Sequence, residues 1–138
     1  MQSTMMTDGL TLDLLLERTE RLFPDTAIVS RAPDRSLHRS NYGEVARRAR
    51  ALAGGLQRAG LRSGDRVASL MWNHAAHLEA YFGVPLAGGV LHTLNLRLSP
   101  EDLLYIIQHG GDRLLILYDV LLPLFERIRD RVNLERVW

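Results

Sequence analysis

The 138-residue sequence contains neither cysteine nor lysine. Without cysteine, the chain cannot form a disulfide, bind zinc through thiolates or use a cysteine nucleophile. Without lysine, it cannot form a Schiff base through a side chain or hold a phosphate with the lysine of a P-loop. All 17 basic side chains are therefore arginines, which can still bind phosphate.

Long apolar runs and a strong net charge are also absent. The N-terminal stretch MQSTMMTDG is polar and does not resemble a signal peptide. No run of 18 apolar residues follows that would cross a membrane. The formal net charge of +1 gives no electrostatic reason to expect a nucleic acid or an anionic membrane as partner. We therefore expect a cytoplasmic protein without a membrane span.

Common phosphate-binding and hydrolase motifs are missing as well. The sequence has no GxxxxGK[ST], no GxGxxG that opens a helix after a strand, and no GxSxG. The glycine pairs at 54–55, 88–89 and 110–111 are explained by close packing or by helix ends. Size and composition are those of one folded domain with room for a core.

What the sequence does contain is an alternation of helical and extended patterns. Apolar spacing predicts an amphipathic first helix whose apolar face includes Leu12, Leu15, Leu16, Leu22 and Phe23. A turn at 33–35 predicts a short hairpin. We expect helices over 11–23, 41–60, 73–87, 100–109 and 120–130, and strands over 27–30, 37–39, 66–71, 90–93, 114–118 and 135–138.

Strands that alternate with helices of 10–15 residues predict right-handed crossovers and a largely parallel sheet, so the expected fold class is α/β. Two helix ends carry strong signals: Ser99 is a hydroxyl cap followed by Pro100, and a glycine pair follows His109. The last strand begins near Glu135 and has no room to finish. We therefore expect a flexible segment at 1–10 and an incomplete domain at 11–138.

Three residues on the 73–87 helix raise the possibility of a metal site. His74 and His77 are three residues apart, a spacing that can place two imidazoles on one ion. Glu79 lies two residues farther on, which at 100° per residue carries it to another face of the helix. We therefore favour surface histidines over a metal site.

The end of the 90–93 strand is the best candidate for a binding site. In parallel sheets, ligands bind beyond the carboxyl ends of strands, where His92, Thr93 and Asn95 fall. His92 has no acid partner or nucleophile evident in the sequence, so a substrate-lining role is favoured over catalysis. We expect Arg97 to pair locally with Glu101 or Asp102 rather than to contact substrate.

Four arginines of the 41–60 helix fall mostly off its apolar face. A solvated helix surface is the favoured interpretation, and a phosphate-binding patch is the alternative. The four residues are Arg47, Arg48, Arg50 and Arg58.

Most of the chain resembles the opening part of adenylate-forming enzymes, and within them the medium- and long-chain fatty-acyl-CoA ligases. The similarity extends from about Tyr42 to Arg131 and includes GDRVA at 64–68 and MWNHAAHLEAYFGVPLAGG at 71–89. Its most specific piece is GGVLHTLNLRL at 88–98, which differs from the form typical of peptide-synthetase adenylation domains.

This resemblance implies that residues 11–138 are the N-terminal portion of an AMP-binding domain. It also implies a complete enzyme that uses ATP, Mg²⁺ and coenzyme A: a carboxylate attacks the α-phosphate of ATP, and the coenzyme A thiol then displaces AMP. The family's phosphate loop, magnesium motif and catalytic lysine lie later in the chain and have no counterpart here. We therefore expect no catalytic, cofactor-binding or metal-binding residue in this chain.

Two hypotheses follow. The first is a fragment of a fatty-acid-CoA ligase that is inactive alone, with His92, Thr93 and Asn95 at the margin of its acyl-adenylate pocket. The second is a non-catalytic module that pairs with a separate ligase remainder, or with itself, through an exposed sheet edge. Both leave acyl-chain length open.

Overall fold

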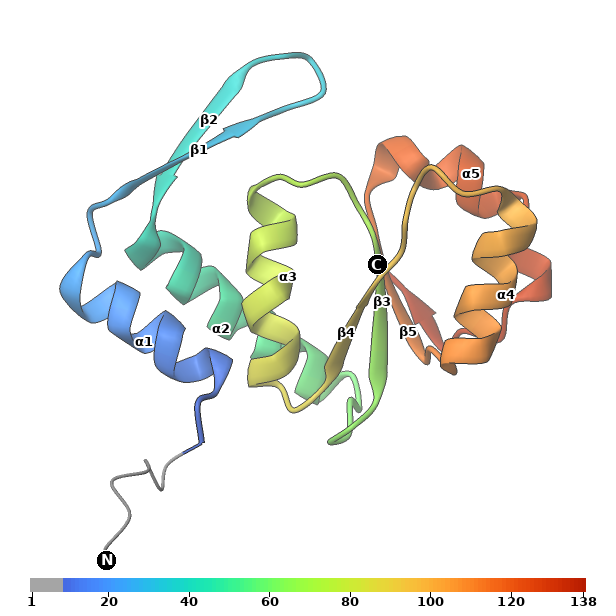
Figure 1. Ribbon diagram of the computed structural model, residues 1–138, viewed down its shortest axis with the longest axis horizontal. Coiled ribbons are helices and arrows are strands. Elements are labelled where there is room, and N and C mark those ends of the chain that lie inside the picture. Colours follow the sequence, from blue (N-terminus) through green and yellow to red (C-terminus); the bar gives the residue numbers. More distant parts are fainter. Residues whose placement is uncertain (1–8) are drawn as a thin grey trace, which may run out of the picture.

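The computed structural model describes residues 9–138 (Figure 1). The predicted flexible segment 1–10 lies outside the described residues, apart from Gly9 and Leu10, which precede the first helix. None of the helices in the described range combines the length and apolarity needed to cross a membrane. Helices and strands alternate as predicted, with an additional two-stranded hairpin.

Four parallel strands form the main sheet in the spatial order β4-β3-β5-β6. The strands are β3 (Arg66–Leu70), β4 (Val90–Thr93), β5 (Leu114–Leu117) and β6 (Arg136–Val137). Ala68 in β3 lies beside His92 of β4 on one side and Leu115 of β5 on the other. The all-parallel sheet confirms the predicted α/β class and brings the carboxyl ends of β3, β4 and β5 to one edge.

Helices cover both faces of this sheet (Figure 1). One face packs against α2 (Tyr42–Arg58) and α3 (Ala75–Leu86), and the other against α4 (Pro100–Gly110) and α5 (Leu122–Glu126). Because successive strand residues point to opposite faces, Val67 joins the α2–α3 core and Ala68 joins the α4–α5 core. The sheet is thus the central layer of three.

The helix ends follow the signals in the sequence. Asn41 Oδ1 accepts a hydrogen bond from the Glu44 amide at 2.8 Å and caps α2. Ser99 Oγ accepts one from the Asp102 amide at 3.1 Å, and Pro100 fills the first position of α4. Gly111 ends α4 with a φ of 66°. Such a cap is worth about 1 kcal/mol, so these local choices fix where α2 and α4 begin.

The predicted hairpin is also confirmed. Strand β1 (Ala27–Arg31) pairs with β2 (Leu37–Asn41) in an antiparallel ladder that projects away from the main sheet (Figure 1). In its turn, Asp34 Oδ1 accepts hydrogen bonds from the amide and the hydroxyl of Ser36, at 2.9 and 2.6 Å. These hydrogen bonds stabilise the turn from within.

The first helix, α1 (Leu12–Leu22), is amphipathic as predicted, but most of its apolar face is uncovered. Leu16 is buried and packs against Ala46 and Ala49 of α2. The other predicted face residues are about half exposed: Leu12, Leu15, Leu22 and Phe23. The reason is geometric, because among the described residues α1 contacts α2 and α3 from one side only (Figure 1).

The C-terminal segment differs from the prediction of one helix over 120–130. Instead, a 3₁₀ turn η1 (Asp119–Leu121), the five-residue α5 and a second turn η2 (Arg129–Arg131) follow one another. Pro123 lies in the first turn of α5, where its missing N–H is tolerated. A separate helix therefore begins there, and the predicted single helix over 120–130 does not form. The strand expected at 135–138 is present as β6.

Candidate functional site

A hollow of about 310 Å³ lies at the carboxyl edge of the sheet, between the segments that follow β3 and β4. Thr93 ends β4, and Asn95 and Arg97 follow it in the loop to α4. Trp72 and Asn73 form the facing wall. The structure therefore brings Thr93 and Asn95, two of the three predicted site residues, to one hollow at the predicted edge.

Local hydrogen bonds fix the loop that carries these residues. The Leu94 amide donates to the Ser69 carbonyl at 2.9 Å and extends the strand pairing by one residue. Asn95 Oδ1 accepts a hydrogen bond from the Arg97 amide at 3.0 Å in an Asx turn. The loop is thus held by its own backbone and leaves the Thr93 hydroxyl at the surface.

Arg97 does not form the expected local ion pair. Glu101 instead binds Arg131, with Nη1 to Oε1 at 2.7 Å, and Asp102 accepts a hydrogen bond from the Ser99 hydroxyl at 2.7 Å. Among residues 9–138, the Arg97 guanidinium has no carboxylate partner and lines the hollow. The prediction of a local pair was therefore wrong, because Glu101 pairs with Arg131, which is thirty residues away in sequence.

His92 lies on the opposite face of β4 from Thr93 and does not line this hollow. Its Nδ1 is 2.9 and 3.0 Å from the two carboxylate oxygens of Asp112. The Asp112 side chain is fully buried, and burial raises the pKa of its carboxyl while the His92 imidazole opposes that shift. Sequence analysis found no acid partner for His92, and the structure corrects that conclusion.

The end of α4 closes over this pair. A methyl group on Gly110 would lie 3.0 Å from Cε1 and Nδ1 of the His92 ring, so the ring packs directly on the helix backbone. Glycine at 110, the last residue of α4, therefore permits this contact, and Gly111 ends the helix. Because Asp112 follows His92 by twenty residues, no local sequence signal linked the two.

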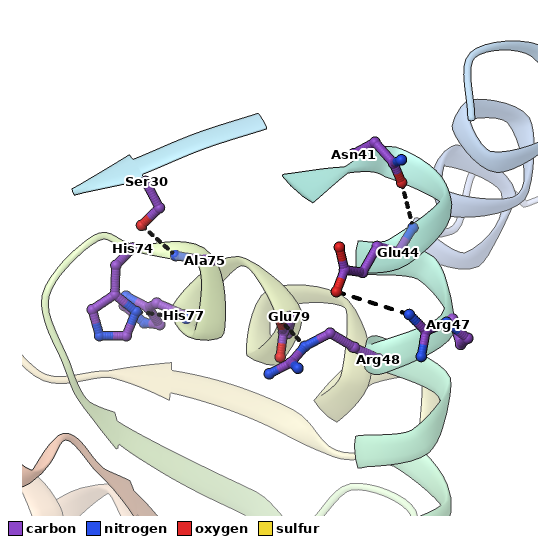
Figure 2. Close-up of polar contacts among 9 residues, drawn as sticks. All are labelled: Ser30, Asn41, Glu44, Arg47, Arg48, His74, Ala75, His77 and Glu79. Carbon is purple, nitrogen blue, oxygen red and sulfur yellow. Dashed lines mark hydrogen bonds and ion pairs between the residues drawn. The ribbon is translucent and has the colours of Figure 1, made fainter. Parts of the chain in front are cut away.

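A second histidine arrangement surrounds the start of α3 (Figure 2). His77 is buried, and its Nε2 is 3.0 Å from the Ser69 hydroxyl, which is itself fully buried. His74 caps α3 by accepting a hydrogen bond from the His77 amide at Nδ1, at 3.4 Å. Burial lowers the pKa of both imidazoles.

The third residue considered for a metal site at these histidines has another partner. Glu79, the third residue considered, accepts a hydrogen bond from Nε of Arg48 in α2 at 2.6 Å (Figure 2). Within the described range, no three His, Asp or Glu residues are arranged to hold a metal ion. His74 thus caps a helix, and Glu79 belongs to an interhelical ion pair. The prediction of surface histidines is wrong for His77, which is buried.

The hairpin is tied to this region by a contact that sequence analysis missed. The Ala75 amide donates a hydrogen bond to the Ser30 hydroxyl of β1 at 3.0 Å (Figure 2). A residue 45 positions away thus satisfies one of the free amides at the start of α3. No local pattern would have indicated it.

The arginines of α2 are mostly neutralised by carboxylates. Arg47 lies 3.8 Å from Glu44, and Arg50 binds Glu20 of α1 at 2.5 Å. Arg48 is held by Glu79 as described. Three of the four arginines considered for a phosphate patch therefore face acids, which favours the predicted solvated surface.

Known proteins are similar to this chain in sequence and in architecture. The sequence profile described as "AMP-binding enzyme" matches residues 16–137. A long-chain-fatty-acid–CoA ligase of Thermus thermophilus is 51% identical over 131 residues, which are 95% of this chain and 24% of that protein. A 3-methylmercaptopropionyl-CoA ligase of Ruegeria lacuscaerulensis is 42% identical, over 96% of this chain and 25% of that protein.

Solved structures of acyl-CoA ligases have a similar fold. The anthranilate CoA ligase AuaEII, in complex with anthranoyl-AMP, superposes with a TM-score of 0.79 at 27% identity, over 89% of this chain and 23% of that one. The described fold thus matches the N-terminal domain of adenylate-forming acyl-CoA ligases. The chain spans about a quarter of the length of these proteins.

Proposed function

We propose, starting from the fact that the chain belongs to the AMP-binding enzyme family, that it is the N-terminal part of an ATP-dependent fatty-acyl-CoA ligase. The observation that carries the proposal is the 51% identity to a long-chain-fatty-acid–CoA ligase across 95% of the chain. In the complete enzyme, a fatty acid, ATP, Mg²⁺ and coenzyme A would be the reactants. We also place that enzyme in the cytoplasm, as the sequence predicts.

The reaction has two steps in this proposal. The acid's carboxylate attacks the α-phosphate of ATP, which forms an acyl-adenylate and releases pyrophosphate. The thiol of coenzyme A then attacks the acyl carbon and releases AMP. Negative charge builds up on phosphate oxygens in the first step, so cations and oriented amides have to stabilise it.

The sequence has no lysine to hold a triphosphate, and five of its 17 arginines are already bound to carboxylates: Arg47, Arg48, Arg50, Arg113 and Arg131. We therefore propose that this chain does not activate a carboxylate unaided. ATP and Mg²⁺ would be held by the rest of the enzyme.

The hollow at Thr93, Asn95 and Arg97 would form the margin of the acyl-adenylate pocket. It lies beyond the carboxyl ends of two parallel strands, where ligands of α/β proteins bind. The Thr93 hydroxyl and the Arg97 guanidinium supply a hydrogen-bonding group and a cation. His92 would support this margin from behind, through β4 and Asp112.

Two proteins test the proposal. Residues 1–138 alone should show no ATP–pyrophosphate exchange with a C8 to C16 fatty acid and Mg²⁺. A chimera in which residues 1–138 replace the N-terminal quarter of the Thermus thermophilus ligase should restore exchange, whereas that ligase without its first quarter should not. Exchange by the isolated chain, or an inactive but folded chimera, would contradict the proposal.

The same chimera tests the hollow. Arg97→Gln and Thr93→Ala should raise the KM for fatty acid or ATP by about threefold to tenfold, as expected for the loss of a partly exposed polar contact. Arg129→Gln, an exposed arginine in η2 far from the hollow in sequence, is the control. Unchanged KM values for both hollow variants would exclude a substrate-lining role.

A second function is favoured by a separate observation. A hollow of about 580 Å³ lies between α2 and the sheet, where small residues of the helix face Ile116 and Trp138: Ala51, Gly55 and Ala59. This hollow and the outer edge of β6 would bind a separately encoded ligase remainder. Co-purification of residues 1–138 with the truncated Thermus thermophilus ligase, lost with Ala59→Arg, would support this pairing module, and elution as two separate species would exclude it.

A further inference from the structure

A larger hollow, of about 620 Å³, lies on the other side of the Trp72–Asn73 segment from the hollow that Thr93 and Asn95 line. The hairpin turn forms one wall of it, and the segment that follows β5 forms the other. Its lining is mainly apolar and aromatic, and includes Pro33, Trp72, His74, Tyr118, Val120 and Leu121. Its size falls within the range of small-molecule sites, about 300–1,000 Å³.

The apolar side chains of this hollow are accessible. Trp72 and Val120, which both line the hollow, are 47% and 46% exposed. His74 and Tyr118 form an edge-to-face pair, with ring centroids 4.3 Å apart, and support the aromatic wall. The hollow therefore offers an open surface to the apolar body of a ligand.

One cation stands at this hollow. Arg31, the last residue of β1, lines it and forms no ion pair among residues 9–138. Two carboxylates adjoin lining residues in sequence, Asp34 and Asp119, and neither lines the hollow. Asp34 Oδ1 accepts hydrogen bonds from Ser36, and Asp119 Oδ1 accepts one from the Val120 amide at 2.7 Å. The site thus combines an apolar wall with a single free positive charge.

From this combination we propose that the hollow between the hairpin and the Tyr118–Leu121 segment binds a carboxylic acid with an apolar body. The carboxylate pairs with the Arg31 guanidinium, and the apolar body lies against Trp72, Tyr118 and Val120. The site is separate from the Thr93 hollow. It requires no ATP, so it does not depend on the proposed ligase activity.

Tryptophan fluorescence provides a direct measurement, because the chain contains only Trp72 and Trp138. In a Trp138→Phe background, Trp72 is the sole reporter. Dodecanoate, titrated below its micelle concentration, should change the Trp72 emission in a saturable manner. Dodecanol, which lacks the charge, should bind more weakly.

Two matched pairs of variants locate the site. Arg31→Gln should weaken dodecanoate binding about fivefold, the size expected for an exposed ion pair, and leave dodecanol unchanged. Arg39→Gln, on the neighbouring strand β2 but outside the hollow, should change neither. Val120→Asp should abolish binding of both ligands, whereas Leu122→Asp, at a similarly exposed position outside the hollow, should not.

Two outcomes of these measurements would overturn the proposal. If dodecanoate gives no saturable change, the hollow is not a site for this class of ligand. If the two arginine variants, or the two aspartate variants, behave alike, binding occurs elsewhere on the surface. Circular dichroism of each variant shows that the fold is retained, because all four positions are exposed.

Discussion

The molecule holds two histidines by opposite means. His92 faces a fully buried carboxylate, Asp112, on the α4 side of the sheet. His77 faces a neutral hydroxyl, Ser69, on the α3 side, and its Nδ1 is buried without a hydrogen-bond partner among the described residues. One arrangement contains an ionisable pair, and the other consists of neutral groups only.

This difference indicates where charge is tolerated in the domain. Burial disfavours an ionised carboxylate, yet the His92 ring offers Asp112 a partner within 3.0 Å. At His77, burial lowers the pKa of the imidazole and the nearby His74 lowers it further, while a hydrogen bond with the Trp72 backbone opposes the shift. The two helix layers thus respond differently to mutation and to acid.

Removal of the buried carboxylate should have the largest effect on stability. Asp112→Ala should lower the free energy of unfolding by about 2–3 kcal/mol, because it leaves the His92 ring unpaired against α4. Urea unfolding measures the loss. Asp130→Ala, at an exposed position in η2, should change stability by less than about 0.5 kcal/mol. Equal effects would show that the pair contributes nothing specific.

A double-mutant cycle tests whether Ser69 and His77 are coupled. Ser69→Ala alone should cost about 1–2 kcal/mol, because both nitrogens of the buried His77 ring then lack partners. Adding His77→Phe removes the stranded polar ring, so the double variant should be less destabilised than the sum of the two single changes. Strict additivity in thermal or urea unfolding would contradict a coupled pair.

The tie between the hairpin and α3 gives a smaller effect. Ser30→Ala removes the acceptor of the Ala75 amide and should cost about 1 kcal/mol, as for loss of a helix cap. Ser63→Ala, at an exposed turn position, is the control. Amide hydrogen exchange should become faster at Ala75 in Ser30→Ala alone. Unchanged exchange there would mean that the hairpin does not cap α3.

The smallest expected effect is a change in the pH dependence of stability. Burial lowers the pKa of His74 and His77 below their ordinary value of 6.5, so the unfolded chain binds protons more readily than the folded one. The stability due to the neutral rings is complete above 6.5 and is lost as the pH falls through the lowered folded pKa. The Tm should therefore fall on acidification.

The Ser69→Ala/His77→Phe variant isolates this effect, because it lacks one of the two buried rings but keeps Asp112. Its Tm should fall less than that of the unmodified chain between about pH 8 and about pH 5. His38→Gln, at an exposed strand position, should leave the slope unchanged. A slope that is the same in all three proteins would show that His77 does not titrate differently on folding.

Local chemistry explains what the sequence predicted well. The caps Asn41 and Ser99 and the end of α4 at Gly111 depend on residues within four positions of each other. The parallel sheet follows from helix-length spacings between short apolar strands. Thr93 and Asn95 fell at the carboxyl edge for the same topological reason.

Contacts between distant segments explain what it missed. Asp112 reaches His92 across the sheet face, and Arg131 reaches Glu101 over thirty residues. The predicted ion pair of Arg97 with Glu101 or Asp102 does not form. Proximity in sequence gives no information about a distant partner such as Arg131. The exposure of the apolar face of α1 could not be predicted either. The spacing of apolar residues shows that a helix has an apolar side, but not which neighbours cover it.

The loop after β3 has a consequence for the two hollows that it separates. Trp72 and Asn73 form a wall of each, so a molecule that displaces this wall from one side alters the space on the other. Occupancy of the two sides is then thermodynamically linked, and the influence has to be equal in both directions.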